Sequence, residues 1–239
     1  MNIKQIHVGG ILVDVVFKDI KNIHLSVHPP TGRVRISAPA RMKLDTLRVY
    51  AISKLDWIKK QQVRFQGQER ETQREYLDRE SHFVWGRRYL LKVHEEEQAP
   101  SLELRHTQLV LTVRPGSTIQ KKEEVVSAWY REELRNAMLP LLAKWEPSLG
   151  VRSNRVIVRR SKTKWGSCNP HSRIIHLNSE LAKKPRECLE YVIIHELVHL
   201  LEPTHNAHFL SLMDKYLPQW RHIRDELNRA PLGHVEWEY

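Results

Sequence analysis

Hydrophobic and polar positions near the N-terminus alternate as they do along β-strands. The segments GILVDVVF and RVRISAP are rich in apolar residues or apolar at every second position, and the turn-forming sequence PPTG lies between them. We therefore predict short strands over residues 8–39. Further on, five apolar residues fall on one face of a predicted helix over residues 43–65: Leu44, Leu47, Ala51, Leu55 and Ile58. Residues 66–81 are polar throughout, which indicates either a linker or an exposed helix end.

A similar pattern returns in the next part of the chain. The segments RRYLLKVHEE, SLELRH and QLVLTVRP are typical of strands, and Pro115 closes this set as Pro39 closes the first set. A helix is predicted to follow from about residue 121 to 145. The two strand–strand–helix units are about 76 residues apart, so we interpret them as a candidate internal repeat, although few residues are identical between them.

The last third of the chain contains three short strand candidates, RVIVRR, KTKWGSC and RIIHLN. Helical signals then extend from Pro185, a residue type that suits the first turn of a helix, to Pro203. A last helix is predicted over residues 206–228. Together these elements predict an α+β fold. We divide it into an N-terminal α+β region, residues 1–119, and a second domain, residues 120–239.

Composition narrows the class of protein to which the chain can belong. Of its 239 residues, 41% are hydrophobic and 28% are charged, and no apolar run is long enough to cross a bilayer. The N-terminal sequence MNIKQIHVGG lacks the charged-then-apolar layout of a signal peptide. Only two cysteines occur, Cys168 and Cys188, which provides no disulfide framework. These features predict a cytoplasmic protein in a reducing environment.

The sequence YVIIHELVHLLEPTH combines an apolar helix with three histidines and a glutamate. Apolar side chains surround the predicted helix 186–201 on nearly every side, which is typical of a buried helix. His195 and His199 are four residues apart and therefore lie one above the other, whereas Glu196 points about 100° away from His195. Buried polar groups need partners, and a metal ion is a common partner for two stacked imidazoles.

The spacing H-E-x-x-H on a helix is the signature of zinc hydrolases. The two histidines can bind one Zn²⁺, while Glu196 can act as general base on a water molecule that the zinc activates. Such a site needs a third protein ligand and keeps its fourth position open. His205 follows His199 by six residues, and Pro203 ends the helix so that the chain can turn back. We therefore predict that His195, His199 and His205 bind Zn²⁺ and that Glu196 is catalytic.

Alternatives to this arrangement stay open at the level of the sequence. The spacing matches the metzincin pattern H-E-x-x-H-x-x-G-x-x-H, but Glu202 occupies the position of the glycine, so the chain must turn differently there. The third ligand could instead be His208 or a downstream carboxylate such as Glu226. The two helical histidines could also be core residues that hydrogen-bond to backbone groups.

Three further residues are candidates for contact with a substrate or with the transition state. If RIIHLN lies at a sheet edge, an extended peptide could pair with it, and His176 and Asn178 would then lie near the cleft. Tyr216 could donate a hydrogen bond to the developing oxyanion. Ordinary packing, or exposure on a strand, is the commoner role for all three. Cys168 and Cys188 are most simply explained as small core residues.

Basic residues crowd the segment before the predicted zinc helix, where Glu180 is the only acid between residues 152 and 186. They are Arg152, Arg155, Arg159, Arg160, Lys162, Lys164, Arg173, Lys183, Lys184 and Arg186. The whole chain has a formal charge of +11. This charge favours weak nucleic-acid binding in addition to binding of a peptide or protein substrate. The alternative function is therefore a nucleic-acid-associated protein whose zinc site acts on DNA-bound proteins or is structural. Solvated strand faces are the simpler explanation.

Several segments together resemble the YgjP-like metallopeptidase family, which is similar to the WLM and SprT-like zinc proteases. They are KTKWGSC, IIHLNSEL, EYVIIHELVHL, THNAHF and YLPQW, with RVRISAP and KLDWIKKQ nearer the N-terminus. The resemblance implies a compact zincin-like metallopeptidase domain in which a helix, a small sheet, the zinc-binding helix and a closing helix pack together. It also implies zinc ligands at His195, His199 and His205 and a catalytic Glu196.

Overall fold

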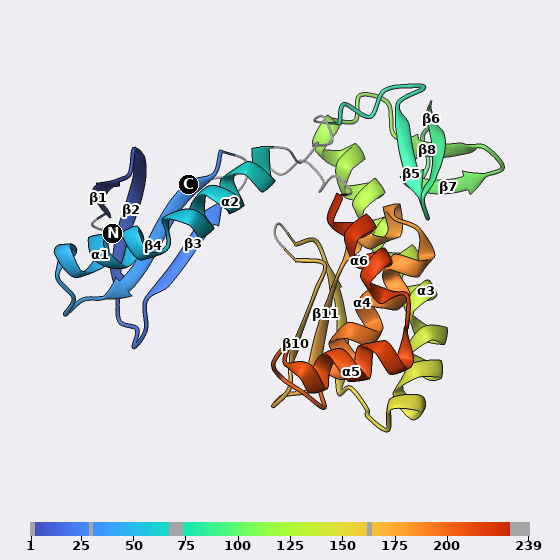
Figure 1. Cartoon of the computed structure of the whole chain (residues 1–239). Coiled ribbons are helices and arrows are strands. Elements are labelled where there is room, and N and C mark those ends of the chain that lie inside the picture. Colours follow the sequence, from blue (N-terminus) through green and yellow to red (C-terminus); the bar gives the residue numbers. More distant parts are fainter. Residues whose placement is uncertain (1–2, 29–30, 67–73, 162–163, 230–239) are drawn as a thin grey trace. The chain divides into compact units, whose positions relative to one another are not determined.

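The computed structural model describes residues 3–28, 31–66, 74–161 and 164–229. The chain forms two compact units, Met1–Glu69 and Arg70–Tyr239 (Figure 1). Each unit has its own hydrophobic core. Strands and helices occur in both units, so the predicted α+β class is confirmed. No helix in the described part of the chain combines the length and apolarity that crossing a membrane requires.

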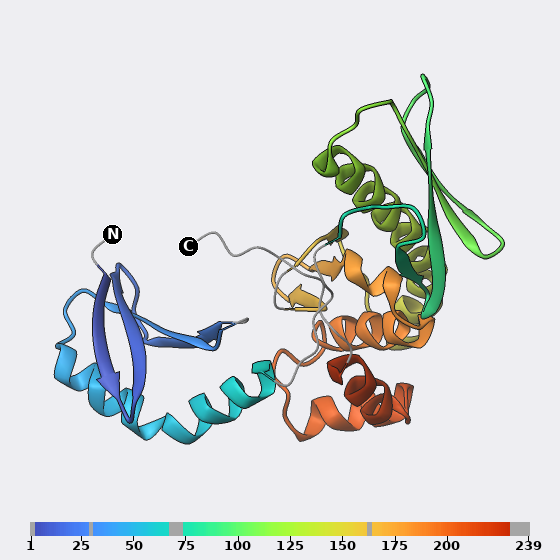
Figure 2. The same ribbon diagram turned by 90° about the horizontal axis from the view of Figure 1, so that it is seen from above.

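The first unit is a four-stranded sheet followed by two helices. In chain order its elements are β1 (Ile3–Val8), β2 (Ile11–Lys18), β3 (His24–His28), β4 (Arg33–Pro39), α1 (Leu44–Ser53) and α2 (Leu55–Gln66). The strand order is β1-β2-β4-β3; β2 and β4 are parallel, and the outer pairs are antiparallel. The single helix predicted over residues 43–65 is interrupted at Lys54, where φ is −110° and ψ is 9°. The two helices follow one another along this unit (Figure 2).

One face of this sheet forms the core of the first unit. Val15 on β2 and Ile36 on β4 are paired neighbours and fully buried, and they belong to the same core as Leu47 and Ile58 on the two helices. Every second residue of the two strands therefore faces α1 and α2, as the two-residue period predicts. In β2 the residues between them, Asp14 and Val16, are buried as well.

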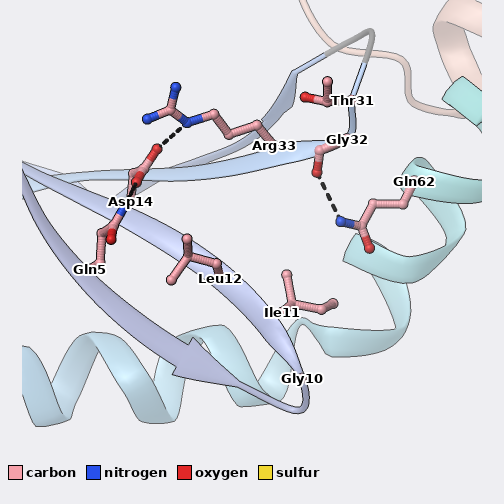
Figure 3. A pocket seen from close by; sticks show the side chains of 9 residues that line it. All are labelled: Gln5, Gly10, Ile11, Leu12, Asp14, Thr31, Gly32, Arg33 and Gln62. Carbon is pink, nitrogen blue, oxygen red and sulfur yellow. Dashed lines mark hydrogen bonds and ion pairs between the residues drawn. The ribbon is translucent and has the colours of Figure 1, made fainter.

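Asp14 lies on the opposite face of the same sheet and lines a cleft of about 500 Å³, together with Arg33 of β4 and Gln62 of α2 (Figure 3). Asp14 is only 1% exposed there, and it accepts hydrogen bonds from Nε of Arg33 and from the amide of Gln5. Burial alone would raise the pKa of Asp14, but these hydrogen bonds and the arginine charges lower it overall. At the cleft rim, the Gln62 amide donates to the carbonyl of Gly32 over 2.9 Å.

The second unit contains two sheets and the remaining helices. Its elements are β5 (Ser81–Val84), β6 (Arg87–Glu95), β7 (Ser101–Arg105), β8 (Gln108–Val113), α3 (Ile119–Leu149), β9 (Arg155–Arg159), β10 (Gly166–Asn169), β11 (Ile174–Asn178), the 3-10 helix η1 (Ser179–Lys183), α4 (Arg186–Val198), α5 (Ala207–Tyr216) and α6 (Trp220–Arg229). Its four-stranded sheet has the order β5-β6-β8-β7, and its three-stranded sheet has the order β10-β11-β9.

The two four-stranded sheets have the same topology. In both, the two central strands are parallel, and each outer strand is antiparallel to its neighbour. The first two strands of each sheet are joined by two residues with positive φ: Gly9 (55°) and Gly10 (79°) in one sheet, Trp85 (50°) and Gly86 (79°) in the other. The two segments that lie about 76 residues apart in the sequence therefore form sheets with the same strand order and directions.

The domain boundary that the sequence predicts, between residues 119 and 120, falls inside the second unit. It lies at the first residue of α3, and β7 and β8 both contact this helix. The second four-stranded sheet therefore packs with the elements of the second unit, and the chain divides at residues 69 and 70.

Helix α4 lies at the centre of the second unit (Figure 1) and contacts α3, α5, α6, β10 and β11. The condition that RIIHLN lies at a sheet edge is not met, because β11 is the middle strand and pairs with both β10 and β9. Among the described strands, β10 and β9 form the two edges of this sheet. The single helix predicted over residues 206–228 is two helices, α5 and α6, because Pro218 interrupts it.

The two separate cores predict that the units can be destabilised independently. Ile36→Ala should lower the free energy of unfolding of the first unit by about 2–5 kcal/mol, because it leaves a cavity in a fully buried position. Hydrogen–deuterium exchange read by peptide should become faster throughout β1–α2 and stay unchanged in α4. Val49→Ala, at a side chain that is 66% exposed, is the matched control. Faster exchange in both units would show that they unfold together.

Candidate metal centre

Helix α4 positions two of the three histidines of the predicted site. It is buried on most sides, as the sequence predicts, and Pro185 precedes its first residue. His195 lies in its last turn, and His199 caps its C-terminus by donating its backbone N–H to the carbonyl of His195 over 3.3 Å. Both side chains therefore project from the same end and face of the helix.

The turn after α4 is built around Glu202, the residue that replaces the glycine of the metzincin pattern. Its backbone N–H donates to the carbonyl of Val198 over 2.9 Å, and its own carbonyl lies 3.1 Å from Nδ1 of His199. Its carboxylate accepts hydrogen bonds from the backbone N–H and the hydroxyl of Thr204, which lower its pKa. These contacts bring the chain back toward the helix and fix the ring of His199 with Nε2 free to bind a metal.

The turn brings His205 to the two helical histidines. The three residues each offer one ring nitrogen, and these atoms lie within 4.8 Å of one another. Nε2 of His205 is 3.1 Å from Nε2 of His195. In the described part of the chain, this is the one group of three or more His, Cys, Asp or Glu residues that could hold a metal ion.

Phe209 forms a common apolar support for the three rings. Its ring centroid lies 5.0 Å from that of His195, 4.7 Å from His199 and 4.6 Å from His205, and the side chain is 1% exposed. Asn206 caps α5 by accepting the backbone N–H of Phe209 over 3.0 Å, which fixes this aromatic residue in place. Sequence reasoning did not identify Phe209, although a cap residue three positions earlier marks the start of its helix.

The donor set fits a zinc ion. Burial above all, then the neighbouring histidines, lowers the pKa of His195 to about 3, and burial also lowers the pKa of His199. Both imidazoles are therefore neutral at pH 7, which is the form that binds metals. Tetrahedral zinc with nitrogen ligands at about 2.0–2.1 Å separates those nitrogens by roughly 3.3 Å. The 3.1 Å between the nitrogens of His195 and His205 is close to this separation.

Glu196 lies beside the histidines and is 4% exposed. Burial raises its pKa to about 8, and the positive charge of Lys164 opposes that rise. Its Oε2 atom is buried and has no hydrogen-bond partner among the described residues. A carboxylate oxygen without a protein partner, next to three converging imidazoles, is suited to hold a water molecule or a substrate proton.

Gly166 on β10 makes room for the Glu196 carboxylate. A Cβ atom at this position would lie 2.5 Å from Oε1 of Glu196 and 2.8 Å from Cγ1 of Val192. The strand can approach α4 this closely because residue 166 has no side chain. Nothing in the sequence relates this glycine to the glutamate on α4, because the contact forms between elements that are distant in the chain.

The structure leaves the alternative third ligands outside the histidine group. Nδ1 of His208 lies 3.5 Å from the carboxylate of Glu202, so it contacts the turn after α4. Glu226 is exposed on α6. Burial above all, and then the charge of Glu226, raises the pKa of Cys188 in the first turn of α4. Cys188 is fully packed in the core, whereas Cys168 is only half-buried on β10.

The three predicted substrate contacts have different surroundings. Asn178 is 1% exposed, and its side-chain amide binds the backbone of Ser161, Lys164 and Glu180. His176 is half-buried on β11. Tyr216 ends α5 and packs against the main core. The structure thus gives Asn178 a bracing role, and substrate contact by the other two stays a prediction.

Parts of the basic segment are already paired with acids. Arg160 donates to Glu123 over 2.7 Å and lies 3.7 Å from Glu180, and Nζ of Lys183 donates to Glu180 over 2.7 Å. Lys184 is 8% exposed. Lys162 lies outside the described residues. Nucleic-acid binding by this segment stays a prediction.

A mixed fold in which an H-E-x-x-H helix and a returning histidine form one metal-competent group is typical of metallopeptidases. The family profile described as YgjP-like, metallopeptidase domain, matches residues 21–230. The chain therefore belongs to the YgjP-like metallopeptidase family. Comparison with curated proteins gives no match.

Two solved structures are similar to part of the chain. The metallopeptidase zymogen of Pyrococcus abyssi abylysin is 23% identical, with a TM-score of 0.32, and the match covers 41% of this chain and 90% of that one. The zymogen of Methanocaldococcus jannaschii jannalysin is 18% identical, with a TM-score of 0.30, and covers 41% and 92% respectively. The family assignment rests on the match over residues 21–230 and not on these partial similarities.

The histidine geometry predicts which substitutions remove the metal. His199→Ala and His205→Ala should each lower zinc content strongly, since each takes one of three ligands away. Glu226→Ala should retain zinc, and His208→Ala is a matched control for a nearby imidazole outside the group. Elemental analysis of protein purified without added metal measures the outcome. Full zinc content in His205→Ala together with loss in Glu226→Ala would contradict the assignment.

Gly166→Ala should displace the Glu196 carboxylate and lower activity, but it should leave metal binding unchanged. The new methyl group must displace the Glu196 carboxylate or Val192, and a displacement of about 1 Å at a reacting group can reduce activity by about 10²-fold. Zinc content should stay near that of the wild type. Ser167→Ala, one position along the same strand, should retain activity because the pleat points it away from α4. Equal activity of the two variants would refute this role of Gly166.

Proposed function

We propose that the chain is a zinc-dependent peptidase in which His195, His199 and His205 hold the metal and Glu196 is the general base. The convergence of three imidazoles beside a buried carboxylate with an unpartnered oxygen is the observation that supports this most strongly. Zinc at this position would polarise the scissile carbonyl and lower the pKa of a water molecule.

The proposed part of Glu196 is to move one proton. It takes the proton from the attacking water and delivers it to the leaving amine nitrogen. A single carboxylate therefore carries out both proton transfers of the hydrolysis. A general base is most effective when its pKa is near the operating pH, and burial shifts the pKa of Glu196 in that direction. Phe209 and the surrounding apolar core exclude bulk water from the far side of the site.

A catalytic metal suits the donor set better than a structural one. Structural zinc has four protein ligands, whereas the described part of the chain brings three histidines together. A fourth position is then available for water or for the substrate carbonyl. We retain His176 and Tyr216 as secondary candidates for substrate contact, and the cytoplasm as the location, which two cysteines without a disulfide support.

The substrate of such a site would be a peptide in extended conformation. Strand β10 is an edge of its sheet in the described structure and contacts α4. A peptide that adds to this edge would be held by main-chain hydrogen bonds, with its scissile bond near the Glu196 carboxylate that Gly166 approaches. Peptides and unfolded proteins are therefore the proposed substrate class.

Glu196→Gln tests the mechanism, because glutamine keeps the size and polarity of the side chain but cannot accept the proton. Hydrolysis should fall by about 10²–10⁴-fold, the usual contribution of a positioned general base. Zinc content and the unfolding transition should change little. The assay is cleavage of an unfolded protein that the wild type degrades and that a chelator protects.

Ser167→Ala serves as the control for a substitution near the site that leaves α4 untouched. If Glu196→Gln cleaves the substrate as fast as the wild type, Glu196 is not the base. If the wild type binds zinc in all preparations but cleaves no peptide or unfolded protein, the proposed peptidase activity is wrong.

A further inference from the structure

A second feature of the second unit is a small pocket directly beside Glu196. It has a volume of about 200 Å³ and lies between the start of β10, one face of α4 and the last turns of α6. On α4 it is lined by Tyr191 and Val192 and, one helical turn later, by His195 and Glu196. The pocket therefore opens onto the proposed general base, and its volume suits one amino-acid side chain better than a whole small molecule.

The inner walls of the pocket are apolar and held in place by packing. Tyr191 is 7% exposed, its ring stacks on that of Trp220 at 6.5 Å, and it meets the ring of His195 edge-on at 5.7 Å. Val192 and Leu227 are 3% and 2% exposed. These side chains leave little freedom for the pocket to collapse or to change its shape.

Two positively charged side chains, Lys164 and Arg224, line the pocket, and the only carboxylate among its lining residues is Glu196 itself. The charge of Lys164 lowers the pKa of Glu196, and that of Arg224 lowers the pKa of Tyr191, against burial in both cases. Apart from Glu196, the charged side chains that line the pocket are therefore both positive.

The charge of Arg224 is only weakly compensated. Its Nε donates to Asp225 over 2.9 Å, and its Nη2 lies 2.8 Å from the same oxygen. The two side chains are 42% and 55% exposed, and an ion pair that solvent reaches to this extent contributes little. The guanidinium group also lies 5.0 Å from the centre of the Trp220 ring, which orients it.

Asn178 fixes the other positive side of the pocket. Its Nδ2 donates to the carbonyls of Ser161 and Lys164, each over 2.9 Å, from a side chain that is 1% exposed. The backbone of Lys164 is therefore held to the end of β11, and its side chain starts from a fixed position.

We propose that this pocket is a specificity subsite that binds a carboxylate on the residue adjoining the scissile bond. The inference rests on the proposed peptidase function. Two cations above apolar walls recognise a carboxylate by charge-assisted hydrogen bonds, while an aliphatic stem contacts Tyr191 and Leu227. The carboxylate belongs either to an acidic side chain or to the C-terminus of a short peptide.

The test compares matched peptides with Glu, Gln or Lys at each of the two positions that flank the scissile bond. Cleavage of the Glu peptide should exceed that of the Gln peptide by at least about tenfold in kcat/KM at one of these positions, the effect of one charge-assisted hydrogen bond. Peptides that end one residue after the scissile bond, with a free or an amidated C-terminus, distinguish a terminal carboxylate from an acidic side chain.

Arg224→Glu should reverse the preference, so that the Lys peptide becomes better than the Glu peptide, and Arg224→Gln should reduce the preference toward unity. Arg221→Gln is the matched control, because this arginine is on the same helix and over the same Trp220 ring but does not line the pocket. It should keep the preference of the wild type.

Binding of the uncleaved peptides to zinc-loaded Glu196→Gln gives a readout that does not depend on hydrolysis. The Glu peptide, or the free C-terminal peptide, should bind at least about tenfold more tightly than its neutral counterpart, and Arg224→Gln should remove the difference. Cleavage without any acidic preference, or equal binding of all peptides, would overturn the subsite. If no peptide is cleaved but the Glu peptide still binds more tightly than the Gln peptide, the peptidase function is refuted and the subsite is not.

Discussion

The burial of Glu196, together with the partial burial of His195 beside it, is the constraint on which the rest of the second unit depends. Both side chains project from a helix that is apolar on nearly every side, and an isolated polar group in such surroundings is costly. Their shifted pKa values express this constraint: burial favours the neutral forms of the imidazole and of the carboxyl group. A metal ion bound to His195 and a proton bound to Glu196 would compensate for the hydration that these side chains lose.

The surrounding structure is arranged around these two groups. Glu202 orients the ring of His199 and turns the chain, so that His205 can reach the helix from the other side. Phe209 supports all three rings, and Gly166 lets β10 approach the carboxylate. Each of these residues acts through packing or through one hydrogen bond, and together they hold a donor set that the isolated helix could not complete.

The sequence predicts the part of the site that depends on helical spacing. His195, Glu196 and His199 follow from the 3.6-residue period, and Pro203 indicates that the chain turns before His205. Gly166 and Phe209 could not be predicted in these roles, because their importance arises from contacts between elements that are distant in the chain. The edge position of β10 was also missed, since strand order in a sheet is decided by tertiary pairing.

The same distinction applies to the fold. Alternation in GILVDVVF and RVRISAP is sufficient to predict strands, whereas the spacing of two similar segments indicates only a candidate repeat. The breaks at Lys54 and near Pro218 are local changes of direction within patterns that remain helical in period. The division of the chain after residue 69 falls within the polar segment 66–81, which the sequence indicated as either a linker or an exposed helix end. The contacts that join the second sheet to α3 have no signal in the sequence.

X-ray absorption spectroscopy of the zinc-loaded protein tests the central claim most directly, because it measures the ligands of the metal independently of any substrate. An open site built by His195, His199 and His205 predicts three imidazole nitrogens at about 2.0–2.1 Å and one further light atom that an added anion can replace. A sulfur ligand at about 2.3 Å, or fewer than three imidazoles, would contradict this account of the site.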